Sequence, residues 1–355
     1  MRNAFVLVLV TAMAACSGKS GGNPGGGGGS GGTGGSGGTG GSGGTGGSGG
    51  SGGGGGSGGG GGVDPNGTPA FEIANPDVML SPGQEVTYCY YFHTPNTQTV
   101  AVNKWVSVLA PGSHHMIMFL NPGGSQPADG TIDQNCGIGG GGSGAANVPV
   151  WTYATQTQNQ ELDLPSDDGS GKPLAQNIAP NSAGYFQMHY LNATQGTLTA
   201  HVDLKAYALG PGTSYTQTDA YVTYNNDITI GPGASNVMVS ASCPVPAGVK
   251  FWTMSSHSHK QSVATKVMDG SNMIFSSTDW EHPGAQNWNA PSFFTFTAST
   301  LTWQCTYDNT GSNAGKTVIA GPSAQTNEMC MATGYYFPAT APKFEYFTGG
   351  KCYGL

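Results

Sequence analysis

Charge is scarce in this chain, and positive charge is scarcest. Only 8% of the 355 residues are charged, with 11 Lys and Arg against 19 Asp and Glu, so the formal net charge is −8. Such thinly spread cations form no basic patch that could neutralise phosphates, and nucleic acid is therefore not an expected partner. No two cysteines have the Cys-x-x-Cys spacing, which argues against a zinc ribbon or a thioredoxin-type redox site.

A long apolar run is missing too. The stretch Ala4–Ala15, which follows Arg2, is too short to cross a bilayer and is typical of a bacterial signal peptide. The next residues, Met13-Ala14-Ala15-Cys16, resemble a lipobox, in which the cysteine is lipidated and becomes the new N-terminus. We therefore expect residues 1–16 to be a lipoprotein signal peptide and Cys16 to anchor the chain at the bacterial cell envelope. Ordinary cleavage after a small residue, with Cys16 incidental, is the alternative.

Residues 17–62 consist almost entirely of Gly, Ser and Thr, with repeated GGTGGSGG units. Such a segment cannot bury apolar surface, so it is expected to be a disordered linker. A flexible coil of this length spans roughly 35–40 Å on average, enough to hold a folded domain clear of a membrane surface. It carries no chemistry.

From Val63 the composition changes to short runs of strand-forming residues separated by Gly, Pro and Asn, and no stretch has a convincing helical period. Such a pattern favours an all-β, antiparallel fold of the sandwich or barrel type. A break near Gly210–Thr218 would give two domains, residues 63–212 and 213–355. The runs are Val86–Phe92, Trp105–Leu109, His115–Leu120, Tyr185–Tyr190, Leu198–Leu209, Val237–Cys243, Val249–Met254, Val263–Met268, Phe293–Tyr307 and Ala332–Phe337.

Six cysteines follow Cys16, and an even number in an exported chain predicts three disulfides. They are Cys89, Cys136, Cys243, Cys305, Cys330 and Cys352. Six cysteines allow fifteen pairings, and their spacing alone does not choose among them.

Five of the eight histidines lie in three tight settings. His257 and His259 are two residues apart, so in a strand both would point to one face and could reach one ion. His114 and His115 are adjacent, so sharing an ion would require a bulge, a strand end or different ring nitrogens. His189 would complete a three-imidazole site of a kind that suits copper or zinc.

Met329 could add a thioether to the His257–His259 pair, which would make a soft site that favours Cu(I). Each of these pieces has a plainer interpretation when it is taken alone. An HxH pair is often a polar strand face, a His-His dipeptide occurs in exposed turns, and a lone Met or His is commonly part of the core.

Taken together, the motifs resemble a known family. His-His-Met-x-x-Phe, Gln-x-His-Tyr, His-x-His and Glu-Met-Cys occur in this order, and the likeness extends over roughly residues 85–352. This order is similar to that of the copper type II, ascorbate-dependent monooxygenases, the family of the peptidylglycine α-hydroxylating and dopamine β-monooxygenases. Thr87-Tyr88-Cys89-Tyr90 and Cys305-Thr306-Tyr307 add to the likeness.

The resemblance implies two tandem jelly-roll β-sandwiches with one copper each, two coppers per chain. His114, His115 and His189 would hold an electron-storage copper. His257, His259 and Met329 would hold the catalytic copper, at which dioxygen and a small-molecule substrate react. The implied reaction is hydroxylation of a C–H bond, with ascorbate or a similar one-electron donor as the reductant. The implied disulfides are Cys89–Cys136, Cys243–Cys352 and Cys305–Cys330.

The chain departs from the family at the substrate grip. The peptidylglycine enzymes hold a carboxylate with Arg, Asn and Tyr, whereas the matching positions here are Ser255, Met331 and Thr333. Gln187, two residues before His189, does match the family and is either a support for that histidine or a cross-strand polar contact.

The remaining histidines are expected to have no ligand role. His93 should lie in a turn and His201 on a sheet face, while His282 is the one with the best claim to a place near the substrate. The alternative to an oxygenase is an envelope protein that binds copper on the same six ligands without oxygen chemistry. A binding sandwich without any metal role is a third hypothesis.

Overall fold

The computed structural model describes residues 67–121, 125–134, 150–192, 194–321, 323 and 325–354, with the side chain of His114 left aside. The described residues all belong to one compact unit, Ser57–Leu355. The predicted signal peptide, Cys16 as the predicted lipidation site and the whole glycine tract lie outside the described residues, as does Cys136. Within the part that is described, no helix is long and apolar enough to span a membrane.

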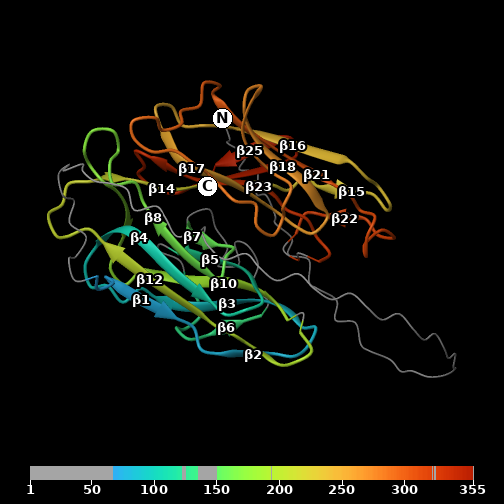
Figure 1. Ribbon diagram of the computed structural model, residues 1–355, viewed down its shortest axis with the longest axis horizontal. Coiled ribbons are helices and arrows are strands. Elements are labelled where there is room, and N and C mark those ends of the chain that lie inside the picture. Colours follow the sequence, from blue (N-terminus) through green and yellow to red (C-terminus); the bar gives the residue numbers. More distant parts are fainter. Residues whose placement is uncertain are drawn as a thin grey trace, which may run out of the picture. The chain divides into compact units, whose positions relative to one another are not determined.

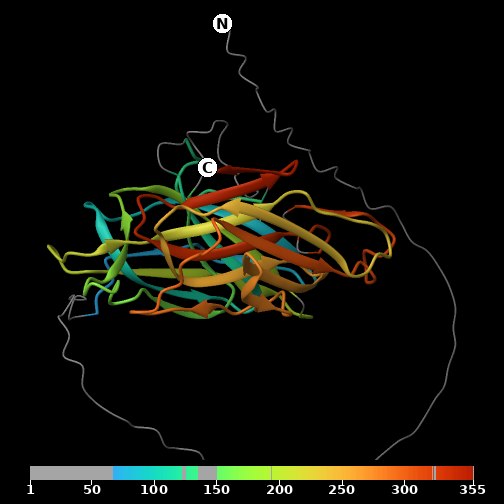
Figure 2. The ribbon, with the colours of Figure 1, turned by 90° about the horizontal axis from the view of Figure 1, so that it is seen from above.

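The fold is all-β, as predicted, and consists of strands in several sheets (Figures 1 and 2). Strands up to Gln217 pair with one another in two large sheets and one small one. The first large sheet contains β1 (Phe71–Ala74), β12 (Val202–Ala208), β4 (Val100–Leu109), β9 (Leu174–Ile178) and β13 (Thr216–Gln217), with β8 (Asn159–Asp163) also on β4. The second contains β6 (Ile132–Asp133), β3 (Glu85–His93), β10 (Ala183–Leu191), β5 (Ser113–Leu120) and β7 (Val150–Thr155). The small one pairs β11 (Leu198–Ala200) with β2 (Val78–Leu80).

Strands from Asp219 onward pair among themselves in the same manner. One sheet has the order β20 (Gln286–Asn287), β17 (Lys250–Ser258), β23 (Cys330–Phe337), β14 (Asp219–Asn225), β24 (Lys343–Thr348) and β25 (Lys351–Gly354). Another has the order β16 (Val237–Pro244), β21 (Thr300–Tyr307), β18 (Ser262–Asp269) and β19 (Asn272–Ser277). A small sheet pairs β15 (Thr229–Ile230) with β22 (Val318–Ile319). Pairing therefore changes partners between Gln217 and Asp219, a few residues after the predicted boundary at 212.

Side-chain contacts join the two sheets of each half into a sandwich. In the first half, Trp105 of β4 packs on Tyr153 of β7, with ring centroids 5.5 Å apart. In the second half, two disulfides cross from one sheet to the other, Cys243–Cys352 between β16 and β25 and Cys305–Cys330 between β21 and β23. Both are pairings that the family resemblance implies. Cys89 is disulfide-bonded as well, and its expected partner lies outside the described residues.

The strands β14, β17 and β23, which are neighbours in one sheet, are buried on both faces. Alternate residues along these strands belong to different apolar clusters: Trp252 packs with the core of the first half, whereas Phe251 packs within the second sandwich. All seven residues of β14 are buried. A sheet covered on both faces loses the apolar–polar alternation that marks a half-exposed strand. The two halves thus share a continuous interface along this sheet.

Asp219 begins β14 as a buried carboxylate. Burial raises the pKa of Asp219 from 3.8 to about 7, although a hydrogen bond from Gln217 opposes the shift. A raised carboxyl pKa in the folded state means that stability is lost as the pH rises from about 4 through about 7. We expect Asp219→Asn to raise the free energy of unfolding at pH 8 by up to about 4 kcal/mol, with no gain at pH 4.

Denaturant unfolding at both pH values would test this expectation. Asp163→Asn is the matched control, because the Asp163 side chain is 70% exposed. An equal gain at the two pH values, or a gain in the control, would contradict the expected titration.

Candidate metal centre

His115 and His189 face each other across two neighbouring strands. They are directly opposed in the β5–β10 register, their ring centroids lie 5.4 Å apart, and both residues are buried. The register then shifts, because the next pair is Ser113 with Tyr190. His114 is thus the extra residue of a bulge, which is the irregularity that adjacent histidines would need in order to share an ion. The His114 side chain itself is outside the described set.

His257 lies near the end of β17, and His259 directly follows Ser258, the last residue of that strand. Their ring centroids are 5.2 Å apart with an interplanar angle of 88°. The short distance agrees with the shared face that strand alternation predicts for residues i and i+2. Both are buried, and His259 is completely so. Burial lowers the pKa of His257 well below its usual range, and the charges of His259 and His189 lower it further. Neutral imidazole is the form that binds metals.

The two pairs meet. The ring centroids of His115 and His257 are 5.3 Å apart. His189, His115, His257 and His259 therefore form one row, in which each half of the fold supplies two rings. The sequence predicted one site in each domain and left the distance between them open. The tertiary structure brings histidines of both predicted sites into contact.

Three of the four imidazole rings contact a polar group of a residue outside the row. His189 Nε2 is 2.7 Å from a Glu85 carboxylate oxygen, and His257 Nδ1 is 2.7 Å from the Gln156 amide nitrogen. His259 Nδ1 is 3.2 Å from the backbone carbonyl oxygen of Asn327. Metal-binding histidines usually donate one ring N–H to a carboxylate or carbonyl oxygen, which the contacts of His189 with Glu85 and of His259 with Asn327 allow, and such a contact fixes the ring orientation and the tautomer. The Gln156 amide nitrogen is a donor, so its contact orients the His257 ring without accepting an N–H from it. Imidazole nitrogens are ligands that suit copper and zinc.

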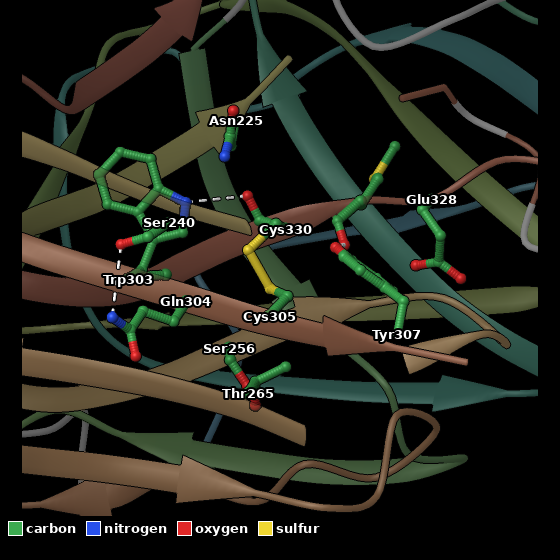
Figure 3. Close-up of a disulfide and its surroundings, with 12 residues drawn as sticks. Asn225, Ser240, Ser256, Thr265, Trp303, Gln304, Cys305, Tyr307, Glu328 and Cys330 are labelled. Atoms are coloured by element: carbon green, nitrogen blue, oxygen red, sulfur yellow. Dashed lines mark hydrogen bonds between the residues drawn. A yellow bond between two sulfur atoms is a disulfide. The ribbon is translucent and has the colours of Figure 1, made fainter. Parts of the chain in front are cut away.

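Met329, the expected thioether ligand, is buried and lies between Glu328 and Cys330. The Tyr307 hydroxyl donates a hydrogen bond to the Met329 carbonyl oxygen at 2.8 Å. Figure 3 shows Tyr307 and Glu328 close to the Cys305–Cys330 disulfide, where the Trp303 indole donates to the Cys330 carbonyl oxygen. The disulfide and these hydrogen bonds fix the backbone of the methionine segment.

Glu328 links the methionine segment to the histidine segment. One carboxylate oxygen accepts the His259 backbone N–H at 2.9 Å, and the other accepts the Gln261 backbone N–H at 2.7 Å. The Met329 backbone N–H also bonds to this carboxyl group. Burial raises the pKa of Glu328 to about 8 against the lowering effect of these donors. A single buried side chain thus holds the backbones beside two predicted ligands.

Removing this carboxyl group should both destabilise the fold and weaken metal binding. Because at least two buried N–H groups would lose their acceptor, we expect Glu328→Ala to lower the free energy of unfolding by about 2–6 kcal/mol. Glu328→Gln keeps one acceptor oxygen and should recover part of the loss. Urea unfolding and copper titration would measure both effects. Glu161→Ala, which removes an exposed partner of Lys104, should change stability by less than about 1 kcal/mol.

Within the described part of the chain, no three His, Cys, Asp or Glu side chains form a group that could hold a metal ion. Neither predicted set of three copper ligands consists only of described His, Cys, Asp or Glu side chains. One includes His114, whose side chain is not described, and the other includes a methionine.

A cavity of about 410 Å³ opens beside the histidine row. His115, His257 and His282 line it, together with Gln156 and Ser255. His282 is held in its loop by a backbone hydrogen bond to Asp279. Among the histidines outside the six predicted ligands, His282 was the one expected near the substrate, and it is the one that lines this cavity. Gln156 was missed, because a lone glutamine in a strand-rich segment carries no signal.

The two remaining histidines, His93 and His201, are not among the residues that line the cavity. His93 ends β3 and contacts Asp129, and His201 lies between β11 and β12 next to Asp77 and Asp203. Both contacts are with carboxylates at the surface. Gln187 is buried in β10, opposite Ile117 of β5.

No protein-family model and no curated protein matches the chain. Among solved structures it is similar to the major capsid protein P2 of bacteriophage PM2, with 7% identity and a TM-score of 0.33 over 74% of this chain and 97% of that one. It is also similar to PNGase F, a glycosylasparaginase of Flavobacterium meningosepticum, with 9% identity and a TM-score of 0.33 over 76% and 97% of the two chains. At these values neither similarity carries an argument about the function of this chain.

Proposed function

We propose that the chain is a copper-dependent monooxygenase that hydroxylates a C–H bond of a small molecule. The observation that carries this proposal is the buried row of four imidazoles, which opens onto a cavity at His115 and His257. One atom of dioxygen would enter the alcohol product and the other would enter water, with two electrons and two protons from ascorbate or a similar donor.

His115 and His189, with His114, would hold one copper, and His257 and His259, with Met329, would hold the other. Bound copper would supply oxygen activation and one-electron transfer. The protein's own part is to orient and to shield. Glu85, Gln156 and the Asn327 carbonyl group fix the rings, and Glu328 fixes the backbone between His259 and Met329. Burial of the four rings would limit the access of bulk water to a metal bound there.

The cavity favours an oxygenase over a protein that only stores copper. Storage requires ligands but no space beside them. Here the space is large enough for a drug-sized molecule and touches histidines of both predicted sites.

Copper content and oxygen uptake of the full chain would test the proposal. After copper loading and exhaustive dialysis we expect two coppers per chain, together with oxygen uptake that requires ascorbate and increases with a substrate. Two coppers without oxygen uptake for any candidate substrate would support the copper-binding alternative. A chain that retains no copper would overturn both functions.

We also propose that Cys16 anchors the protein at the bacterial cell envelope. The disulfides fit an exported chain, since they persist in oxidising compartments. Metabolic labelling with a radioactive fatty acid should mark the parent chain and leave Cys16→Ser unlabelled. Equal labelling of the two proteins would contradict the anchor.

A further inference from the structure

The cavity beside the histidine row is built by both halves of the fold. Ile117, Trp151 and Leu162 come from the first half, and Thr253, Thr333 and Tyr335 come from the second. The Tyr335 hydroxyl donates a hydrogen bond to the Thr152 carbonyl oxygen at 3.2 Å, which ties the two walls together. The shape of the cavity therefore depends on the interface and not on one loop.

Among the described residues that line the cavity, none is Lys, Arg, Asp or Glu, so histidines are the side chains there that could acquire a formal charge. The apolar part is formed by aromatic and branched side chains, among them Trp151 and Ile117, and the polar part by hydroxyl and amide groups such as those of Ser255 and Asn287. Asp279 and Glu281 belong to the same loop as His282 but do not line the cavity.

A charged ligand would lose its hydration in such a site without gaining a partner. Moving an ionised carboxylate or ammonium group out of water costs several kcal/mol unless an opposite charge or a dense set of hydrogen bonds replaces the solvent. Hydroxyl, ether and amide groups can instead bond to the Ser, Thr, Gln and Asn side chains at the wall. Apolar surface on the ligand would pack on the aromatic residues.

We propose that this cavity selects an uncharged substrate with an aromatic or branched apolar body and rejects carboxylates and ammonium ions. As a statement about the substrate class, this inference rests on the proposed oxygenase function. The selectivity resides in the side chains of the walls, so it is measured in the metal-free protein, in which no copper charge at His115 and His257 acts on the ligand.

Three probes with one body would measure this selectivity: 2-naphthalenemethanol, 2-naphthoate and 2-naphthylmethylammonium. Equilibrium dialysis of the metal-free full chain at pH 8, above the ordinary titration range of imidazole, would give each dissociation constant. We expect the alcohol to bind at least about tenfold more tightly than either ion. Equal binding of the alcohol and an ion, or no binding of the alcohol at millimolar concentration, would overturn the proposal.

A charged side chain introduced into the cavity wall tests whether the probes bind in this cavity. Thr333 lies opposite Ser255 in the β17–β23 register, and both residues line the cavity. Thr333→Lys should raise the affinity for 2-naphthoate by about tenfold and leave 2-naphthylmethylammonium excluded. Thr333→Met, of similar length without charge, should keep the preference of the parent. Unchanged 2-naphthoate binding in Thr333→Lys, with circular dichroism showing a folded protein, would place the probes elsewhere and overturn the proposal.

These measurements are independent of copper. Selective binding in a chain that retains no copper would support the preference of the cavity for uncharged ligands and overturn the oxygenase. Two coppers and oxygen uptake in a chain without this selectivity would support the oxygenase and overturn the proposed preference for uncharged ligands.

Discussion

Replacing His257 with alanine should abolish ascorbate-dependent oxygen uptake and reduce the copper content from two per chain to one. Loss of a partner that only supports a ligand lowers metal affinity or activity by about 10–100-fold, so loss of a ligand should exceed about 100-fold. His257 also contacts His115, with ring centroids 5.3 Å apart. The remaining copper should therefore bind more weakly than either copper in the parent, which a titration with a competing chelator would measure.

His93→Ala is the matched control for this substitution. It removes an imidazole that contacts Asp129 at the surface, outside the histidine row. We expect two coppers and the full uptake rate in this variant. Retention of both coppers in His257→Ala, or an equal loss in His93→Ala, would show that the row is not the copper site.

The two disulfides of the second half should differ in what they support, one contributing more to stability and the other more to copper binding. The Cys305–Cys330 bridge closes a loop with a sequence separation of 25, and Cys243–Cys352 one of 109. Loop-closure entropy predicts losses of about 3.5 and about 5 kcal/mol for the two double alanine variants. The variant without Cys305–Cys330 should lose less stability but more bound copper than the other variant, because Met329 directly precedes Cys330.

Copper content would be compared under conditions in which both variants remain folded by circular dichroism. Cys305→Ala with Cys330→Ala should retain one copper, and Cys243→Ala with Cys352→Ala should retain two. The same copper content in the two variants would mean that the disulfide beside Met329 does not position that residue. Urea unfolding of the copper-free proteins would give the order of their stabilities.

Local pattern was sufficient for much of the fold. In β16 and β21 exposed or half-exposed positions alternate with more buried ones, which is the pattern that the sequence displays. Each predicted run overlaps a strand, and the largest departure is Phe293–Tyr307, in which the strand begins only at Thr300. Phe293 and Phe296 instead pack on Phe337 and Phe251. Apolar residues that fill a core edge look like strand residues in a sequence.

The strand β14 was missed for the opposite reason. Its residues, Asp219–Asn225, are all buried, because one face covers the first half of the fold and the other lies inside the second sandwich. Apolar and polar residues alternate along a strand that has one solvent-exposed face, so a strand between two cores does not show this alternation. The burial of Asp219 at the start of this strand could not be predicted from the sequence either, because an aspartate beside a turn normally lies at the surface.

The all-β class and the close histidines His114–His115 and His257–His259 could be predicted from the sequence, because they depend on local pattern and spacing. The Cys243–Cys352 and Cys305–Cys330 pairings came from the family resemblance instead, since spacing does not choose among fifteen pairings. The row of four histidines, the contact of Gln156 with His257 and the cavity beside them could not be predicted. These contacts join residues about a hundred or more positions apart in the chain, across an interface along strands that are buried on both faces.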